Sequence, residues 1–199
     1  MSGTYNVTPV TPTDYRRLAE KRLPRFLFDY IDGGANAEIT LAANVDGFRN
    51  VALRQRVMRD VSTIDTSTIL AGERSAMPVI LAPVGMAGMM ARRGETQAVR
   101  AANEVGVPFT LSTVGICDLA EVRSAASQPF WFQLYMMRDR GVVQELLARA
   151  ESVGCTTLAF TVDLAVTGMR HRDLRNGALS SSWRARAVKA WEIGRHPQW

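Results

Sequence analysis

The sequence predicts an α/β protein in which strands and helices alternate around a parallel sheet. Four short apolar runs start at residues 78, 107, 129 and 157, so successive starts lie 29, 22 and 28 residues apart. Between these runs lie segments whose apolar residues recur at helical spacing. Strands separated by helices at such distances are typical of βα units, in which each helix returns the chain to begin the next parallel strand.

The three segments between the runs have the start and stop signals of helices. Residues 94–106 place small apolar residues on one face and end on a glycine. In residues 118–126, Asp118 and Glu121 have the spacing of a capping box. The third segment carries a similar apolar stripe and also ends on a glycine. We therefore expect one helix after each of the first three strands.

The composition is that of a soluble globular chain of one or two domains. The chain has 199 residues, of which 47% are apolar and 22% charged, enough to bury a core. Its two cysteines form neither a C-x-x-C pair nor a disulfide framework, which favours reduced thiols and suggests no metal site. The sequence has no secretory leader and no apolar stretch as long as a membrane span, so we expect a cytoplasmic protein.

The chain divides into three segments by composition. Residues 1–76 are expected to be helical and extended, residues 77–163 hold the strand–helix units, and residues 164–199 form a basic segment. This last segment has 7 Lys+Arg and 2 Asp+Glu, which accounts for the whole net charge of +5. Such local basicity excludes a nucleic-acid-binding body, which needs a positive stripe across a folded face.

The basic segment also contains three of the four tryptophans, Trp183, Trp191 and Trp199. Amphipathic rings beside cations suit the headgroup region of an anionic membrane surface. A loop helix whose tryptophans cover the rest of the fold explains the pattern equally well. The sequence leaves both interpretations open.

The later strands turn polar toward their carboxyl ends, and alternate residues of a strand share a face. The polar residues expected on one face are Thr110 and Ser112, Gln133 and Tyr135, and Thr161 and Asp163. The residues expected on the other face, under the helices, are Phe132, Leu134, Leu158, Phe160 and Val162. Three strands with the same polarity on one face predict a binding site at their carboxyl ends.

Arg170 follows the fourth strand and is a candidate anion clamp. A guanidinium group fits a substrate carboxylate through two parallel hydrogen bonds. Tyr135 or Tyr30 could add a hydroxyl donor, although Tyr30 by itself is more simply a core residue of the helix PRFLFDYID. The alternative for Arg170 is a surface ion pair with Asp173, three residues further on.

Five sequence blocks, in this order, closely resemble the FMN-dependent 2-hydroxy-acid dehydrogenases and oxidases. They are RLPRFLFDYIDGGANAE, LAPVGMAGM, LSTVGIC, WFQLYMMRDRG and FTVDLAVTGMRHRDLRNG, and the similarity runs from about Tyr15 to Trp199. Within the family, the nearest branch is the bacterial membrane-associated L-lactate dehydrogenases. DLAVTGMRHRDL is at least as similar to the mandelate dehydrogenases, and an oxidase that uses oxygen is a further alternative. Gly85 stands where the oxidases commonly have Ala, which favours a dehydrogenase.

The resemblance implies a (β/α)₈ TIM barrel with an N-terminal helical segment, of which about the first four βα units are present. It implies FMN as cofactor, with the backbone of Ala82, Pro83 and Val84 against the flavin. Hydrogen bonds to the flavin ring are implied for Ser112, Gln133 and Thr161. Binding of the substrate carboxylate and hydroxyl is implied for Tyr30, Tyr135 and Arg170, with Tyr135 also expected to be catalytic.

The implied reaction is oxidation of L-lactate to pyruvate, with electrons passed to the respiratory chain. By the resemblance, an active-site Lys, the catalytic base of a His-Gly-Gly-Arg motif, a second Arg and the phosphate site lie beyond these residues. His171 and His196 do not match that motif, so the chain is expected to be truncated and inactive alone. A non-catalytic half-barrel that binds a partner is the alternative. The full-length protein is expected to be a homo-oligomer attached peripherally to the cytoplasmic face of the inner membrane.

Overall fold

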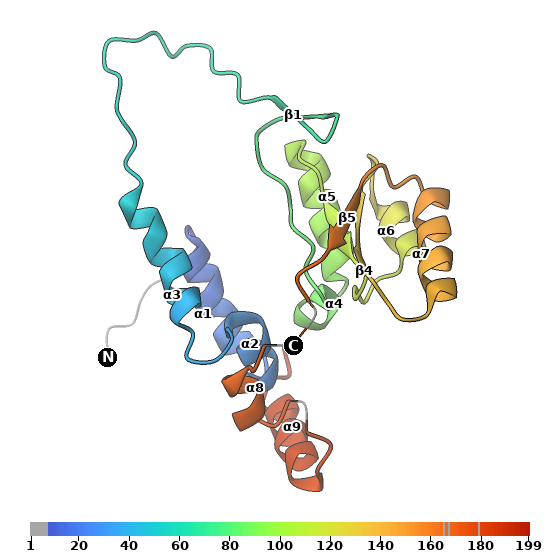
Figure 1. The fold of residues 1–199 in the computed structure, drawn as a ribbon. Helices are drawn as coiled ribbons and strands as arrows, with labels where there is room; N and C mark the ends of the chain where they lie inside the picture. Colours follow the sequence, from blue (N-terminus) through green and yellow to red (C-terminus); the bar gives the residue numbers. More distant parts are fainter. Residues whose placement is uncertain (1–7, 165, 167, 179) are drawn as a thin grey trace. The chain divides into compact units, whose positions relative to one another are not determined.

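The computed structural model describes residues 8–164, 166, 168–178 and 180–199, and Figure 1 shows their helices and strands. The chain forms two compact units. Unit 1 consists of residues 1–54 and 167–199, and unit 2 of residues 55–166. Segments from both ends of the chain therefore pack together. The three segments expected from composition remain a prediction.

Unit 2 contains the parallel sheet that the sequence predicts. Its strands are β3 (Thr110–Ser112), β4 (Trp131–Tyr135) and β5 (Leu158–Thr161), in the order β3-β4-β5. Both pairs are parallel, with Ser112 opposite Gln133 and Tyr135 opposite Thr161. The helices are α4 (Ala87–Met90), α5 (Gly94–Val105), α6 (Leu119–Ala125) and α7 (Arg140–Ser152). The α/β fold class and the alternation of strands and helices are confirmed.

The first expected strand, residues 78–84, does not form. Only a single parallel bridge joins Leu81 to Phe109. The Leu81 N–H donates to the carbonyl of Pro108 at 2.9 Å, and the Leu81 carbonyl accepts from Thr110 at 3.0 Å. Residues 78 and 83 are both prolines without an N–H, so the ladder has few donors with which to extend on either side of this bridge.

The core of unit 2 lies between the sheet and the helices. Its members include Val99 of α5, Val122 of α6 and Leu134 of β4, all at most 2% exposed. Phe132 is buried as expected, but Leu158 and Phe160 are 47% and 48% exposed. The expectation that they lie under helices is corrected, because β5 is the outer strand of the sheet.

A short antiparallel hairpin precedes the sheet. It pairs β1 (Thr68–Leu70) with β2 (Glu73–Ser75). The two turn residues, Ala71 and Gly72, have φ values of 48° and 86°. Positive φ at both central residues is the geometry that two-residue hairpins favour.

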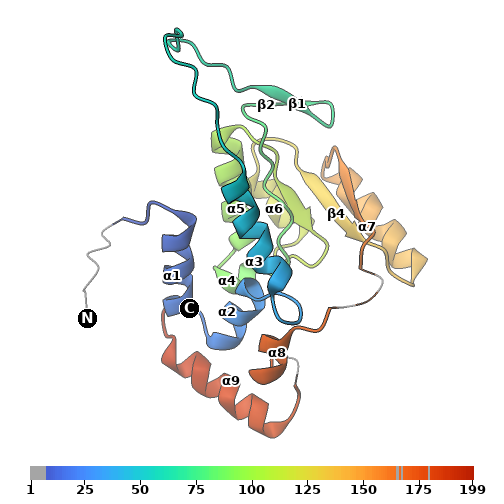
Figure 2. The ribbon, with the colours of Figure 1, turned by 60° about the vertical axis from the view of Figure 1, so that its left-hand side comes forward.

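Unit 1 is helical. Its elements are α1 (Pro12–Arg22), α2 (Arg25–Asp32), α3 (Ile39–Asp46), η1 (Gly47–Asn50), α8 (His171–Arg175) and α9 (Trp183–Arg195). Figure 2 shows α8 beside α2, two helices that lie about 140 residues apart in the sequence. Glu192 of α9 accepts a hydrogen bond from the backbone N–H of Arg25 at 3.1 Å. The Glu192 carboxylate thus accepts a hydrogen bond at the start of α2, where the N-cap residue Pro24 makes no side-chain cap hydrogen bond.

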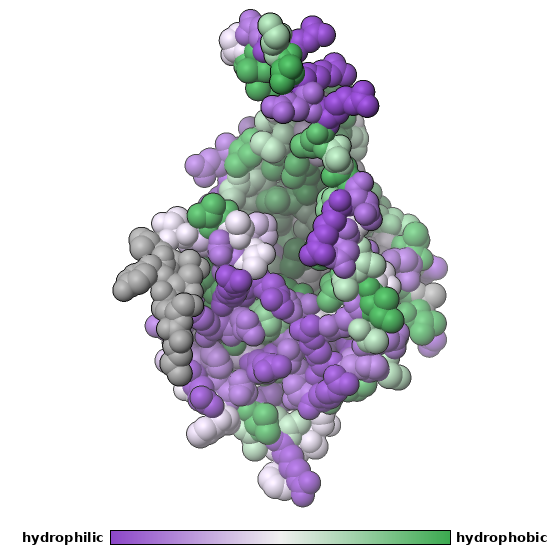
Figure 3. Space-filling model, turned by 90° about the vertical axis from the view of Figure 1, so that its left-hand side faces the viewer, coloured by the Kyte–Doolittle hydropathy of each residue, from purple (hydrophilic) through white to green (hydrophobic). Residues whose placement is uncertain are grey.

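Many apolar side chains of the described residues lie at the surface, and Figure 3 shows such residues in green on one face. In the segment between α3 and β1, Leu53 is 95% exposed and Met58 fully exposed. None of the helices in the described ranges combines the length and apolar character needed to cross a bilayer.

Candidate functional site

A row of polar side chains crosses the carboxyl ends of all three parallel strands in unit 2. The Ser112 hydroxyl donates to Gln133 Oε1 at 3.2 Å, and Gln133 Nε2 donates to Thr161 Oγ1 at 2.7 Å. Gln133 is 2% exposed and Ser112 5% exposed. These three residues share a face because of the strand alternation and the parallel register.

The side-chain amide of Gln133 is held by further hydrogen bonds. The Thr113 N–H donates to the side-chain Oε1 at 3.2 Å, and the Thr113 hydroxyl donates to the backbone carbonyl of Gln133 at 2.5 Å. The Thr113 hydroxyl in turn accepts from the Tyr135 N–H at 3.1 Å. Tyr135 is half-buried at the end of β4, and Asp163, two residues beyond β5, is exposed.

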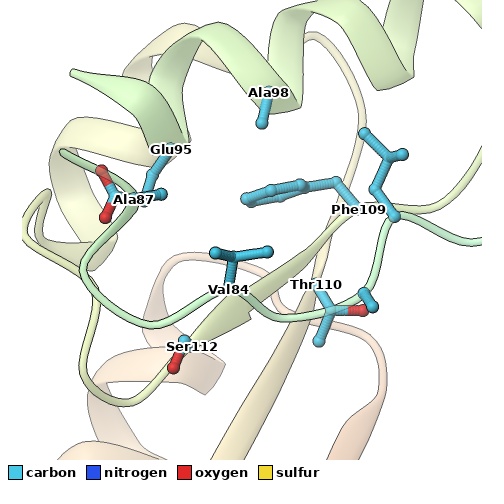
Figure 4. Close-up of a pocket in the computed structure, with 9 residues that line it drawn as sticks. Val84, Ala87, Glu95, Ala98, Phe109, Thr110 and Ser112 are labelled. Atoms are coloured by element: carbon cyan, nitrogen blue, oxygen red, sulfur yellow. The ribbon is translucent and has the colours of Figure 1, made fainter. Parts of the chain in front are cut away.

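Ala82, Pro83 and Val84 are exposed beside a cavity of about 320 Å³. The cavity is lined by Leu81, Ala82, Val84, Ala87, Glu95, Ala98, Phe109, Thr110 and Ser112. Figure 4 shows the Phe109 ring between Ala98 of α5 and Val84. The cavity thus lies mainly on the helix side of the bridged segment and reaches the polar row only at Ser112.

Glu95 is a buried carboxylate that the sequence analysis did not single out. It is 2% exposed, and its Oε1 accepts from the N–H of Gly88 at 3.0 Å and of Ile116 at 2.8 Å. It therefore connects the segment that follows Val84 to the one that follows Ser112. The signal available in the sequence is its position four residues before the buried Val99, on the apolar face of α5.

The hydrogen bonds at Glu95 favour its charged form. Burial acts to raise the pKa of Glu95, but the N–H groups of Ile116 and Gly88 outweigh it and hold that pKa below its usual value. Burial, followed by the neighbouring Glu95, raises the pKa of the Cys117 thiol to about 11. Cys117 is therefore a neutral buried thiol.

Unit 1 holds the other expected site residues, Tyr30 of α2 and Arg170 before α8. Arg170 Nε donates to Asp173 Oδ2 at 2.6 Å, and its Nη2 donates to the backbone carbonyl of Tyr30. The guanidinium carbon lies 5.1 Å from the centroid of the Tyr30 ring. Both Tyr30 and Arg170 are half-buried, and Asp173 is 1% exposed. The ion pair with Asp173 exists, but it is not the exposed surface pair considered from the sequence.

The expected site residues thus form two groups, one in each unit. Ser112, Gln133 and Thr161 form one hydrogen-bonded row in unit 2, and Tyr30 contacts Arg170 in unit 1. Parallel strands joined by helices define an α/β protein, and proteins of this class bind their ligands at the carboxyl ends of the strands, where these polar side chains lie.

The family model for FMN-dependent dehydrogenases matches residues 19–199. The chain belongs to this family. It is 58% identical over 190 residues to an L-lactate dehydrogenase of Caulobacter vibrioides, covering 92% of this chain and 50% of that protein. It is 54% identical over 187 residues to an L-lactate dehydrogenase of Alcaligenes faecalis, covering 94% and 49%. The chain therefore spans about half the length of the curated relatives it matches.

Solved structures show the same likeness. The crystal structure of the monotopic membrane protein (S)-mandelate dehydrogenase superposes with a TM-score of 0.85 at 34% identity, covering 94% of this chain and 50% of that one. A crystal structure of mandelate oxidase with benzoyl-formic acid gives 0.80 at 38% identity, covering 85% and 50%.

FMN is the cofactor of this family, and the polar row fits it. A flavin ring carries hydrogen-bond donors and acceptors along one edge. Ser112, Gln133 and Thr161 present hydroxyl and amide groups, which can both donate and accept. Ser112 and Thr161 end their strands, and Gln133 lies between them in β4. The residues that would hold the ring are therefore already ordered by their bonds to one another.

Proposed function

We propose that the chain supplies the flavin-binding and substrate-binding residues of an FMN-dependent L-lactate dehydrogenase. The observation that carries the proposal is the hydrogen-bonded row Ser112–Gln133–Thr161 toward the carboxyl ends of the parallel strands, in which Ser112 and Gln133 are buried. Its burial and its bonding across three strands distinguish it from the ordinary polar endings of surface strands. The identity to L-lactate dehydrogenases, up to 58%, supports the choice of reaction.

Each candidate residue has a role that follows from its chemistry. Arg170 binds the substrate carboxylate, and the hydroxyls of Tyr30 and Tyr135 donate to the carboxylate or the 2-hydroxyl group. Bound FMN supplies the acceptor for the two electrons released when the 2-hydroxy acid becomes a 2-keto acid. Ser112, Gln133 and Thr161 orient the ring, and the backbone of residues 82–84 lies against it.

We propose further that the three-stranded sheet and the bridged segment at 78–84 belong to a (β/α)₈ barrel, about four of whose units lie in this chain. Oxidation of the hydroxyl group needs a base to take its proton. His196 has its Nδ1 2.6 Å from the Glu192 carbonyl in unit 1, and His171 begins α8. Neither histidine belongs to the His-Gly-Gly-Arg motif that the resemblance implies, so we propose that the base comes from outside these residues and that the chain alone does not oxidise lactate.

A mandelate dehydrogenase is the second candidate. By their names, the two solved structures reported above belong to enzymes that act on mandelate. This likeness favours a 2-hydroxy acid with a larger side chain than that of lactate. Their identities of 34% and 38% are well below the 58% shared with the lactate enzyme. L-lactate is therefore the proposed substrate.

The proposed location is the cytoplasmic face of the inner membrane, with the respiratory chain as electron acceptor. Helix α9 supports attachment to an anionic surface. Its Trp183 and Trp191 are 74% and 65% exposed, and Arg184 and Arg195 lie over their respective rings. Exposed rings paired with cations are suited to the headgroup region.

The test joins residues 1–199 to the half of the Caulobacter vibrioides L-lactate dehydrogenase that the match does not cover. This joined protein is expected to bind FMN and to reduce a dye with L-lactate faster than with (S)-mandelate. The unjoined chain is the control and is expected to show no turnover. A joined protein that binds FMN but prefers mandelate, or that oxidises no 2-hydroxy acid, contradicts the proposal.

A further inference from the structure

Asp173 is a buried carboxylate with one partner. It lies in α8, 1% exposed, and its Oδ2 accepts from Arg170 Nε at 2.6 Å. Its Oδ1 is buried with no hydrogen-bond partner in the part of the chain that the structure describes. Burying a carboxylate is costly unless a cation and hydrogen bonds compensate it. The position of Asp173 therefore depends on Arg170, and Asp173 in turn restrains Arg170.

Arg170 uses only one edge of its guanidinium group within unit 1. Nε and Nη2 share that edge, and they donate to Asp173 and to the Tyr30 carbonyl respectively. On the outer edge, formed by Nη1 and the second hydrogen of Nη2, Nη1 has no partner among the described residues, and Nη2 makes one further, long contact, to the Asp29 carbonyl at 3.5 Å. Two parallel N–H groups on one edge are what a carboxylate accepts as a bidentate pair.

The neighbouring Arg172 shows the opposite arrangement. Its Nη1 donates to Asp32 at 2.8 Å and its Nη2 to Glu38 at 2.5 Å, so its outer edge is occupied by the protein. The two arginines lie two residues apart and are similarly buried, with side chains 29% and 30% exposed. Arg172 therefore joins the helices of unit 1, whereas on the outer edge of Arg170 the Nη1 group has no partner among the described residues.

We propose that Asp173 is a positioning residue, which fixes Arg170 so that its outer edge is available to the carboxylate of the 2-hydroxy acid. The inference rests on the proposed function, because it takes Arg170 as the group that binds the substrate. Holding the guanidinium in advance removes part of the rotamer entropy that a long side chain would lose when the substrate binds.

The test is a double-mutant cycle in the joined protein, with turnover expressed per bound flavin. Asp173→Asn keeps the size of the side chain and removes its charge. It is expected to lower kcat/KM for L-lactate about tenfold, mainly through KM, with flavin content unchanged, because the hydrogen bond from Arg170 to a charged acceptor becomes a weaker one to a neutral amide. In an Arg170→Lys background the same change is expected to cost at most about twofold, since lysine has no fork to orient.

Glu38→Gln is the matched control, because it removes a carboxylate partner from Arg172 rather than from Arg170. It is expected to leave kcat/KM per flavin within about twofold. If Asp173→Asn does not fold, Asp173→Glu takes its place in the cycle, since it keeps the charge and displaces it by one methylene.

Two results overturn the inference while leaving the proposed function intact. One is an equal loss from the Asp173 change in both backgrounds, which would mean that Asp173 acts independently of Arg170. The other is a loss of flavin with normal kcat/KM per flavin, which is the result of a purely structural role. A joined protein that has flavin but no L-lactate turnover before any substitution rejects the proposed function, and this inference with it.

Discussion

The side-chain amide of Gln133 has both of its ends in use. Its Oε1 accepts from Ser112 and Thr113, and its Nε2 donates to Thr161. Sequence analysis could place Ser112, Gln133 and Thr161 on one face, because strand residues alternate with a fixed period. It could not predict the bonds between them, which depend on the register of three strands that are distant in the sequence.

Gln133→Leu is expected to destabilise the chain by about 2 kcal/mol, because each buried polar group left unpaired costs about 1–3 kcal/mol. The measurement is the free energy of unfolding in urea. Gln144→Leu, at an exposed position of α7, is the control and is expected to change stability by about 0.5 kcal/mol or less. Equal effects of the two substitutions would show that the polar row does not stabilise the sheet.

Arg170 is a second residue whose contacts the sequence could not predict. The sequence alone offered two interpretations, an anion clamp and a surface ion pair with Asp173. In the structure Arg170 does pair with Asp173, yet the carboxylate is buried and Nη1 of the guanidinium has no partner among the described residues. The choice between the interpretations required burial and atomic contacts, which residue spacing does not contain.

Among the elements, the strands and helices of unit 2 were the most predictable. Helices α5, α6 and α7 lie where apolar periodicity placed them, together with terminal glycines for α5 and α7 and the spacing of Asp118 and Glu121 for α6. The expected strand at 78–84 is reduced to a bridge between two prolines, and the β1–β2 hairpin was missed. Its turn, Ala71-Gly72, has only one of the residues that favour positive φ, which makes its signal weak.

The segments after Val84 and after Ser112 are joined by Glu95, and this contact predicts a dependence on pH. The pKa of Glu95 is lowered in the folded chain from a usual value of 4.5. Its contribution to stability is therefore present above about pH 4.5 and is lost as the pH falls through the folded-state pKa. Glu95→Gln is expected to cost about 1–2 kcal/mol at neutral pH, and less as the pH falls below about 4.

Urea unfolding at a series of pH values measures this difference. The control is Glu104→Gln, at an exposed position of the same helix, which is expected to change stability by about 0.5 kcal/mol or less at every pH. If the cost of Glu95→Gln were the same at pH 3 and pH 7, the charge on Glu95 would not hold the two segments together.

We predict that helix α9 binds anionic membrane surfaces. The chain is expected to sediment with anionic liposomes at low salt, to bind neutral liposomes less, and to be released as salt rises. Each basic residue near an anionic surface contributes about 1 kcal/mol, and salt screens this attraction. Replacing both Trp183 and Trp191 with Ala is expected to weaken binding, because their exposed rings would no longer enter the headgroup region.

Phe48→Ala is the control for this experiment, since Phe48 is an aromatic residue 80% exposed on η1, a different element. It is expected to leave binding unchanged. Absence of binding to anionic liposomes at low salt, or binding unaffected by the tryptophan changes, would favour the alternative in which the tryptophans cover the fold.

At the scale of the whole molecule, the fold class was predictable and the division into units was not. The parallel order of β3, β4 and β5 follows from a repeated local pattern. The packing of α8 against α2 joins residues about 140 positions apart, and contacts such as Arg172 with Asp32 have no local sequence signal. The proposed roles follow this division in part: the proposed flavin-binding residues and Tyr135 lie in unit 2, and Tyr30 and Arg170 lie in unit 1.

The most direct test of this division of roles is the effect of Arg170→Lys in the joined protein, measured as flavin content and as kcat/KM for L-lactate. A point ammonium cannot reproduce the bidentate edge of a guanidinium, so kcat/KM is expected to fall at least about tenfold. Flavin content is expected to stay unchanged, because the proposed ring contacts all lie in unit 2. A variant that loses flavin but has normal kcat/KM when reconstituted would contradict the account.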